Sequence, residues 1–254
     1  LVAPVGTRGV LLRGHDYGDT SRILRFYTLD YGLLSVMARG VRGRSGKGST
    51  TISTFATGDL TAYVKTGRDL HTMKDFSCTE LREGIGQDVL RFAGASAAAE
   101  LMLAHADQEP HPELFHALDH SLDSLGCADR EHAPMAALSA LWRITVGFGF
   151  APQLDVCVLC GRALDSDEVA RFDFGAGGVR CSDCADEAAG PRIGPIARGQ
   201  VGALIAGDLT VEIQHARRHL GLVSDFVAYH VVSKPLKSLH FLGGLLPHDQ
   251  EVPE

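Results

Sequence analysis

Short runs of alternating apolar and polar residues, separated by Gly and Asp, fill the first eighty positions of the chain. Alternation with a period of two is typical of strands that bury one face. The pattern predicts five strands, at residues 10–12, 22–27, 33–38, 60–65 and 70–76. Five strands in a segment of this length favour a small β-barrel of the OB-fold type, although an SH3-like barrel would read much the same.

The alternation also predicts which side chains fill the barrel. Leu24 and Phe26 share one face of the second predicted strand and are expected to point inward. Arg25 and Tyr27 occupy the opposite face and are expected to point outward.

After about residue 85 the spacing of apolar residues becomes helical. Residues 89–105 are rich in Ala, Pro112 stands where a first helical turn begins, and Leu residues follow it at helical spacing as far as Leu125. Gly126 is predicted to cap that helix. Further helices are predicted from Pro134 to about residue 148 and over residues 220–231.

Two Cys-x-x-Cys pairs, with 20 residues between them, interrupt the helical part. They comprise Cys157, Cys160, Cys181 and Cys184. Thiolates are soft ligands and this spacing is typical of zinc knuckles, so we predict one Zn²⁺ ion. Four thiolates leave no position for a reactive water, so the ion is expected to be structural. Gly161 permits the tight turn in which backbone N–H groups face sulfur.

Two other readings of the cysteines stay open. Two disulfides would need an oxidising compartment, and two redox motifs would each need a thioredoxin-like context. Cys78 and Cys127 stand alone and are expected to be small buried hydrophobic residues. Arg162 and Arg180 flank the cysteines and could offset the negative charge of the thiolates.

These patterns predict an α+β multidomain protein. An N-terminal five-stranded OB-fold β-barrel is expected over residues 1–80. An α-helical domain is expected over residues 81–150 and 191–254, with a four-cysteine zinc knuckle inserted at residues 151–190. No apolar run approaches the roughly 20 residues of a membrane span, and no signal peptide is recognised, so a cytoplasmic location is expected.

Charge is distributed unevenly along the chain. The formal net charge is −7, yet residues 1–80 hold 11 Lys/Arg against 7 Asp/Glu. A basic N-terminal module on an acidic body is typical of a protein with one face for a polyanion.

A cationic, Gly-rich segment follows the third predicted strand and contains Arg39, Arg42, Arg44 and Lys47. Such a loop can follow a phosphate backbone, because glycine removes steric limits and guanidinium groups donate paired hydrogen bonds to phosphate. Aromatic side chains could add stacking with bases, and the candidates are Phe26, Tyr27, Tyr31 and Tyr63. The alternative is a solvated loop that keeps the barrel soluble.

Several motifs resemble those of one family. They are YGDTSRILRFYT at residues 17–28, YGLL at 31–34, MARGVR at 37–42 and KPLKSLHFL at 234–242. In order and spacing they resemble the RecO family of bacterial DNA repair and recombination mediator proteins. Asp19 departs from the family, which more often has Glu there. The four cysteines match the zinc-bearing members, whereas many other members lack them.

The resemblance implies a non-enzymatic, nucleoid-associated protein that binds single- and double-stranded DNA and anneals complementary strands. It also implies that RecR is a partner and that the two help RecA replace single-stranded-DNA-binding protein. Matching motif positions make DNA-binding candidates of Arg22, Arg25, Arg39 and Arg42. Charge alone adds Arg44, Lys47, Lys65 and Arg68.

Two alternative functions follow from other features. His111-Pro-Glu113 followed by Cys157 and Cys160 partly mimics a zinc deaminase, but Val156 replaces the usual proline. Alternatively, the protein is an adaptor without annealing activity. In that case the apolar stripe of residues 220–231, with Lys234 and Lys237 nearby, would hold the acidic tail of single-stranded-DNA-binding protein.

Overall fold

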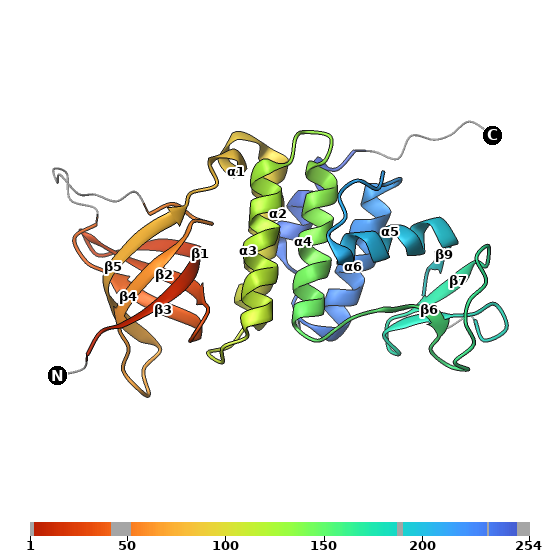
Figure 1. Ribbon diagram of the computed structural model, residues 1–254, viewed down its shortest axis with the longest axis horizontal. Coiled ribbons are helices and arrows are strands. Elements are labelled where there is room, and N and C mark those ends of the chain that lie inside the picture. Colours follow the sequence, from red (N-terminus) through yellow and green to blue (C-terminus); the bar gives the residue numbers. More distant parts are fainter. Residues whose placement is uncertain (1–2, 42–51, 187–189, 233, 248–254) are drawn as a thin grey trace.

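The five predicted strands form a closed barrel at one end of the molecule (Figure 1). This computed structural model describes residues 3–41, 52–186, 190–232 and 234–247. The strands are β1 Val5–Tyr17, β2 Ser21–Thr28, β3 Gly32–Ala38, β4 Thr57–Tyr63 and β5 Leu70–Glu80. They are ordered β1-β2-β3-β5-β4, with β1 closing onto β4 and β3 parallel to β5. The prediction of an OB-fold barrel is confirmed.

The barrel interior follows the predicted alternation. Leu24 and Phe26 are fully buried among the apolar side chains that fill the barrel. Tyr27 points outward as predicted, but it is also fully buried because it packs against Phe115 of the helical region, with ring centroids 6.5 Å apart. The outer face of the barrel near Tyr27 is therefore an internal contact surface.

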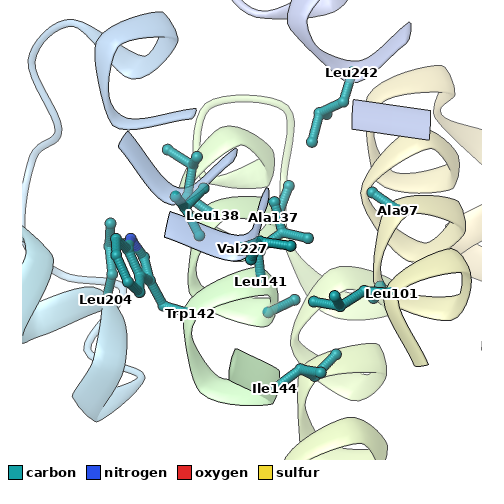
Figure 2. Close-up of a cluster of buried hydrophobic side chains, with 14 of the residues drawn as sticks. Ala97, Leu101, Ala137, Leu138, Leu141, Trp142, Ile144, Leu204, Val227 and Leu242 are labelled. Atoms are coloured by element: carbon teal, nitrogen blue, oxygen red, sulfur yellow. The ribbon is translucent and has the colours of Figure 1, made fainter. Parts of the chain in front are cut away.

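Seven helices lie beyond the barrel in the part of the chain that the structure describes. They are α1 Glu83–Gln87, α2 Val89–His105, α3 Pro112–Cys127, α4 Ala133–Gly147, α5 Pro195–Ala206, α6 Ala216–His230 and α7 Lys237–Leu245. Their shared core centres on α4, where Trp142 and Leu141 are buried between helices that lie far apart in sequence. Figure 2 shows Leu101, Leu204 and Val227 converging on this helix.

Four helices match the predicted ones closely, with one correction at a helix end. The helix that begins at Pro112 continues through Gly126 to Cys127, so the predicted glycine cap is wrong. Ala128 is its C-cap residue, and the Ala128 N–H donates to the Ser124 carbonyl. Helices α1, α5 and α7 were not predicted from the sequence.

The cysteine segment forms a small four-stranded sheet at the opposite end of the molecule from the barrel (Figure 1). Its strands are β6 Gln153–Cys157, β7 Ala170–Asp173, β8 Gly178–Arg180 and β9 Arg192–Ile193, in the order β6-β8-β7-β9. The helical body therefore separates the cysteines from the barrel. Within the described ranges, no helix is long and apolar enough to cross a membrane.

Candidate metal centre and nucleic-acid interface

Four cysteine side chains converge at one edge of the small sheet. Cys157 ends β6 and Cys181 follows β8, and both are buried, whereas Cys160 and Cys184 lie in the turns that follow. The four Sγ atoms all lie within 4.8 Å of one another, and the Sγ atoms of Cys160 and Cys181 are 3.8 Å apart. All four are free thiols, so the alternative of two disulfides is not what the structure shows.

The cluster has the dimensions of a tetrahedral sulfur site. A zinc–sulfur bond of about 2.3 Å places neighbouring sulfurs of a tetrahedron about 3.8 Å apart. Gly161 adopts a left-handed conformation with φ 73°, and its N–H donates to the Cys157 carbonyl at 2.9 Å. The predicted tight turn is confirmed, and the four thiols could hold a metal ion.

Ionisation of one thiol in the cluster makes ionisation of its neighbours less favourable. Burial alone would raise the pKa of Cys157, but backbone N–H groups of Cys160, Cys181 and Leu159 bring it down to about 6. The neighbouring thiols Cys181 and Cys160 raise the pKa of Cys184 to about 12. Four thiolates can therefore coexist only if a cation neutralises them.

A charged network supports the second cysteine pair. Arg162 donates to both carboxylate oxygens of Glu168, at 2.8 and 3.1 Å, and Glu168 in turn accepts from the backbone N–H of Ser182 at 2.8 Å. These hydrogen bonds, that of Arg162 foremost, lower the pKa of Glu168 to about 2. Bonding to Glu168 and then to Cys181 raises the pKa of Arg162, which therefore lies against the thiols as expected.

The expected role of Arg180 is wrong. Its guanidinium pairs with Asp173 and with Asp186, the latter at 3.0 Å, so its charge is already balanced. The ion pair of Arg180 with Asp173 therefore links β8 to β7, and Arg180 does not offset thiolate charge.

The structure also shows the burial of the two isolated cysteines and the distance of His111 from the cysteine cluster. Cys127 is exposed at the end of α3, so the expectation that it is buried is wrong, whereas Cys78 is half-buried. His111 is the residue before the first turn of α3, makes no side-chain capping hydrogen bond, and lines a small pocket beside Tyr27. Among described residues, the four cysteines are the one group that could hold a metal, and His111 is not part of it.

The cationic candidates occupy three places on the barrel. Arg22 and Arg25 lie on β2, Arg39 directly follows β3, and Lys65 and Arg68 lie in the turn between β4 and β5. Arg42, Arg44 and Lys47 lie outside the described residues.

These candidates differ in how their charge is balanced. Arg22 lies 3.5 Å from the Asp16 carboxylate. In the described part of the chain, Arg25, Arg39, Lys65 and Arg68 form no ion pair, and Arg39, Lys65 and Arg68 are exposed, whereas Arg25 is half-buried. Because no described carboxylate pairs with these four cations, the parts of the barrel that carry them attract anions.

One row of residues crosses the outer surface of the barrel. Arg25 of β2 is directly opposite Ser35 of β3, and Ser35 pairs with Leu70 at the start of β5, beside Arg68. The register therefore places Arg25 in one row with Leu70, and Arg68 lies in the turn two residues before Leu70. Arg39 lies four residues further along β3, about 13 Å away at the rise of a strand. The β4–β5 turn is placed by the Lys65 N–H, which donates to Nδ1 of His71 at 3.2 Å.

The aromatic candidates for base stacking are reduced to two. Phe26 and Tyr27 are fully buried and cannot stack on a base. Tyr31 and Tyr63 are half-buried and keep part of their surface exposed. Tyr17, which sequence reasoning did not single out, is more exposed than either, at 54%.

The apolar stripe of α6 is part of the core. Leu220, Val223, Val227 and Val231 are all buried, so the expectation that this stripe holds a peptide is wrong. The reason is that α6 packs its apolar face on α4 and on Leu242 of α7.

A groove that the sequence did not reveal lies along the first half of α6. It has a volume of about 550 Å³ and runs between α6 and the β9–α5 segment. Ile193, Ile196 and Leu222 line it together with Arg218 and His219. The spacing of apolar residues does not predict this groove, because its two walls are about twenty residues apart in sequence.

Comparison with known proteins covers both halves of the chain. A family model described as Recombination protein O N terminal matches residues 3–82, and one described as Recombination protein O C terminal matches residues 86–240. Proteins named DNA repair protein RecO from Anaeromyxobacter sp. (strain K), Rubrobacter xylanophilus and Prosthecochloris aestuarii are 34%, 32% and 29% identical to it. The alignments cover 78%, 78% and 91% of this chain and 76%, 78% and 93% of theirs.

Proposed function

Because this chain belongs to the RecO family of DNA repair proteins, we propose that it is a recombination mediator that binds single- and double-stranded DNA and anneals complementary strands. With RecR, it assists the loading of RecA onto strands covered by single-stranded-DNA-binding protein. It acts at the bacterial nucleoid and catalyses no covalent reaction.

The observation that carries this proposal is the set of cations on the barrel that lack a carboxylate partner among the described residues. OB-folds bind oligonucleotides across the face of their second and third strands and with the loop between the fourth and fifth. Arg25 lies on β2, and Lys65 and Arg68 lie in the β4–β5 turn, so the cations occupy those places. Arg22, Arg39, Arg42, Arg44 and Lys47 complete the proposed contact set.

Annealing follows from this surface by charge screening. Two complementary strands repel each other through their phosphates, and a cationic surface that neutralises both lowers that repulsion. Contacts to phosphate leave base edges free to pair. The barrel need not recognise sequence, and no nucleophile or general base is required.

We propose that the four cysteines hold one structural Zn²⁺ ion. Support comes from the sulfur spacing, from the N–H groups directed at Cys157, and from the placement of Arg162. The cysteine sheet and the barrel lie at opposite ends of the molecule (Figure 1), so the ion stabilises its own segment and does not contact DNA bound at the barrel.

We also propose that the chain is divided into a DNA-binding barrel at residues 1–80, a helical domain at 81–150 and 191–254, and a zinc knuckle at 151–190. The last strand of the barrel ends at Glu80, and β6 to β9 fall between residues 153 and 193, which supports these boundaries.

Strand annealing with complementary labelled oligonucleotides tests the proposal. The full chain should accelerate annealing, and the double variant Arg39→Gln/Arg68→Gln should anneal more slowly. Arg130→Gln, which removes an exposed arginine between α3 and α4, is the matched control and should anneal at the wild-type rate. Parallel reactions with added RecR measure the partner's effect.

If the wild type failed to accelerate annealing both with and without RecR, the mediator function would be wrong. The chain would then be an adaptor without annealing activity.

The groove along α6 favours one additional binding function. Its apolar walls and Arg218 suit the acidic, amphipathic tail of single-stranded-DNA-binding protein. Lys234 and Lys237 follow the opposite end of α6, about 21 Å along the helix axis, so they lie apart from the groove.

A fluorescent tail peptide tests this function by titration. Ile196→Glu, which places a negative charge on a groove residue that is 68% exposed, should weaken peptide binding at least tenfold. Val89→Glu, at an exposed apolar residue on α2, is the control. Equal binding by wild type and both variants would show that the tail does not occupy the groove.

A further inference from the structure

Two arginines face each other on the outer surface of the barrel. Arg13 of β1 is the cross-strand partner of Arg25 of β2, and the row continues through Ser35 of β3. Directly opposite residues of antiparallel strands have Cβ atoms about 5 Å apart, and like charges in that position destabilise a sheet. The pair is therefore unfavourable for folding unless an anion lies beside it.

Arg25 has no carboxylate partner among the described residues. Its Nε atom is buried, and no described residue accepts its proton. Burial first, and then the charge of Arg13, lower the pKa of Arg25. A guanidinium that is partly desolvated beside another cation has a strong preference for a ligand that carries negative charge.

A carboxylate of α2, the helix that contacts β1, is already hydrogen-bonded elsewhere. Glu100 of α2 accepts a hydrogen bond from the backbone N–H of Ser238 at 2.7 Å and caps the first turn of α7. Burial would raise the pKa of Glu100, but hydrogen bonds from Ser238 and Lys237, and then the charge of Arg13, lower it below its usual value. Glu100 thus connects the arginine pair to the N-terminus of α7.

The start of α7 adds further positive charge to the same place. Lys234 and Lys237 are exposed there, and the first turn of α7 contains no acidic residue. A helix N-terminus itself attracts anions. Positive groups therefore occur at Arg25 and Arg13 on the barrel and at Lys237 at the start of α7. The carboxylate of Glu100 interacts with Arg13 and is hydrogen-bonded to the first turn of α7.

We propose that Arg13, Arg25 and Lys237 form a phosphate-binding junction that carries a DNA strand from the barrel onto the helical body. This inference rests on the proposed function and extends it, because neither Arg13 nor α7 belongs to the predicted contact set. Neighbouring strands are about 4.8 Å apart, so the part of the path from β5 to β1 is about 14 Å long. That length holds more than one phosphate of a single strand.

A nucleic acid suits this surface better than an acidic peptide. The row of Arg13, Arg25 and Ser35 ends at Leu70, two residues after Arg68 in the β4–β5 turn, and a polyanion with regularly repeated charge can contact cations spread over this distance. The apolar groove that suits a peptide lies against the other end of α6.

The test is the affinity of the full chain for a fluorescent oligothymidine of about 30 nucleotides, measured at several salt concentrations. Arg13→Gln/Arg25→Gln should bind on the order of tenfold more weakly, and its salt slope should be smaller in magnitude by about 1.4. Lys237→Gln, at an exposed position where misfolding is not expected, should reduce the magnitude of the salt slope by about 0.7. Arg130→Gln is the control and should match the wild type.

A second readout separates binding from folding. Without DNA, Arg25→Gln should melt at the wild-type temperature or higher, because it removes a desolvated charge next to Arg13. A photoreactive residue at position 237 should crosslink to the bound strand, whereas one at position 130 should not.

Three other outcomes would contradict either the proposed function or this inference alone. If the wild type does not bind DNA, the proposed function itself fails. If it binds and Arg39→Gln/Arg68→Gln weakens binding while the junction variants do not, only this inference fails. If the junction variants bind DNA normally but lose binding of a labelled acidic peptide, the junction is a peptide site and the inference is wrong.

Discussion

Nη2 of Arg82 donates to Oδ1 of Asp119 at 2.6 Å, forming a buried ion pair between the segment that leaves the barrel and helix α3. Nη1 of Arg82 also donates to the Phe55 carbonyl and to Oγ1 of Thr57, at 2.8 and 2.7 Å. Thr57 Oγ1 in turn donates to Asp119 at 2.7 Å. This polar network joins barrel and helices, and it fixes the orientation of one relative to the other.

We predict that Arg82→Ala lowers the free energy of unfolding by about 3 kcal/mol, because it leaves Asp119 as a buried charge without its main partner. The side chains of Arg82 and Asp119 are only 4% and 11% exposed. Urea unfolding of the wild type and the variant measures the difference.

The matched control is Asp123→Ala, which removes the other carboxylate bonded to Arg82. Asp123 is 48% exposed, so its loss should change the free energy of unfolding by less than about 1 kcal/mol. Equal effects of the two substitutions would contradict the assignment of Asp119 as the buried anchor.

We predict that Cys157→Ser abolishes stoichiometric zinc binding and unfolds residues 153–186 before the rest of the chain. Four-thiolate sites contribute folding free energy directly, on the order of 10 kcal/mol for an isolated zinc segment. Metal analysis and hydrogen exchange measure the two effects. Cys127→Ser, at an exposed cysteine away from the cluster, should change neither. Unchanged exchange at β6 and β8 after zinc removal would show that the metal is not structural.

His219 makes stability depend on pH. Its Nε2–H donates to Oε1 of Gln200 at 2.9 Å, because Gln200 uses its own N–H on the Glu212 carbonyl. Burial, and then the charge of His215, lower the pKa of His219 to about 4. At acidic pH the unfolded chain therefore binds a proton at this residue and the folded chain does not.

We predict that this histidine removes up to about 3 kcal/mol of stability as the pH falls from about 6.5 to about 4, and nothing above that range. The control is His219→Gln, which can still donate to Gln200 but does not titrate. The difference in unfolding free energy between wild type and variant should change across that pH range. A constant difference would mean that His219 titrates normally.

The strands of the barrel could be predicted because one face of each is buried, which leaves a period of two in the sequence. The cysteine cluster could be predicted because sulfur ligands must lie close in space and their spacing is restricted. In contrast, strands β6 to β9 have two to five residues each and are too short to show a period.

Other features depend on contacts between distant segments, which the sequence does not display. The row that joins Arg13 to Arg25 depends on strand register and on the bulge between Leu11 and Arg13. The helical spacing of apolar residues in α6 is the same whether that face binds a partner or packs on α4. The contribution of Arg42, Arg44 and Lys47 stays a prediction, because they lie outside the described residues.

The salt dependence of single-stranded DNA affinity tests the central claim most directly. If about four side chains of the barrel contact phosphates, a plot of log K against log salt concentration should have a slope of roughly −3, from about −0.7 per contact. The slope should be the same for strands of different base sequence, since phosphates carry no sequence information. A slope near zero, or strong dependence on base sequence, would contradict the account.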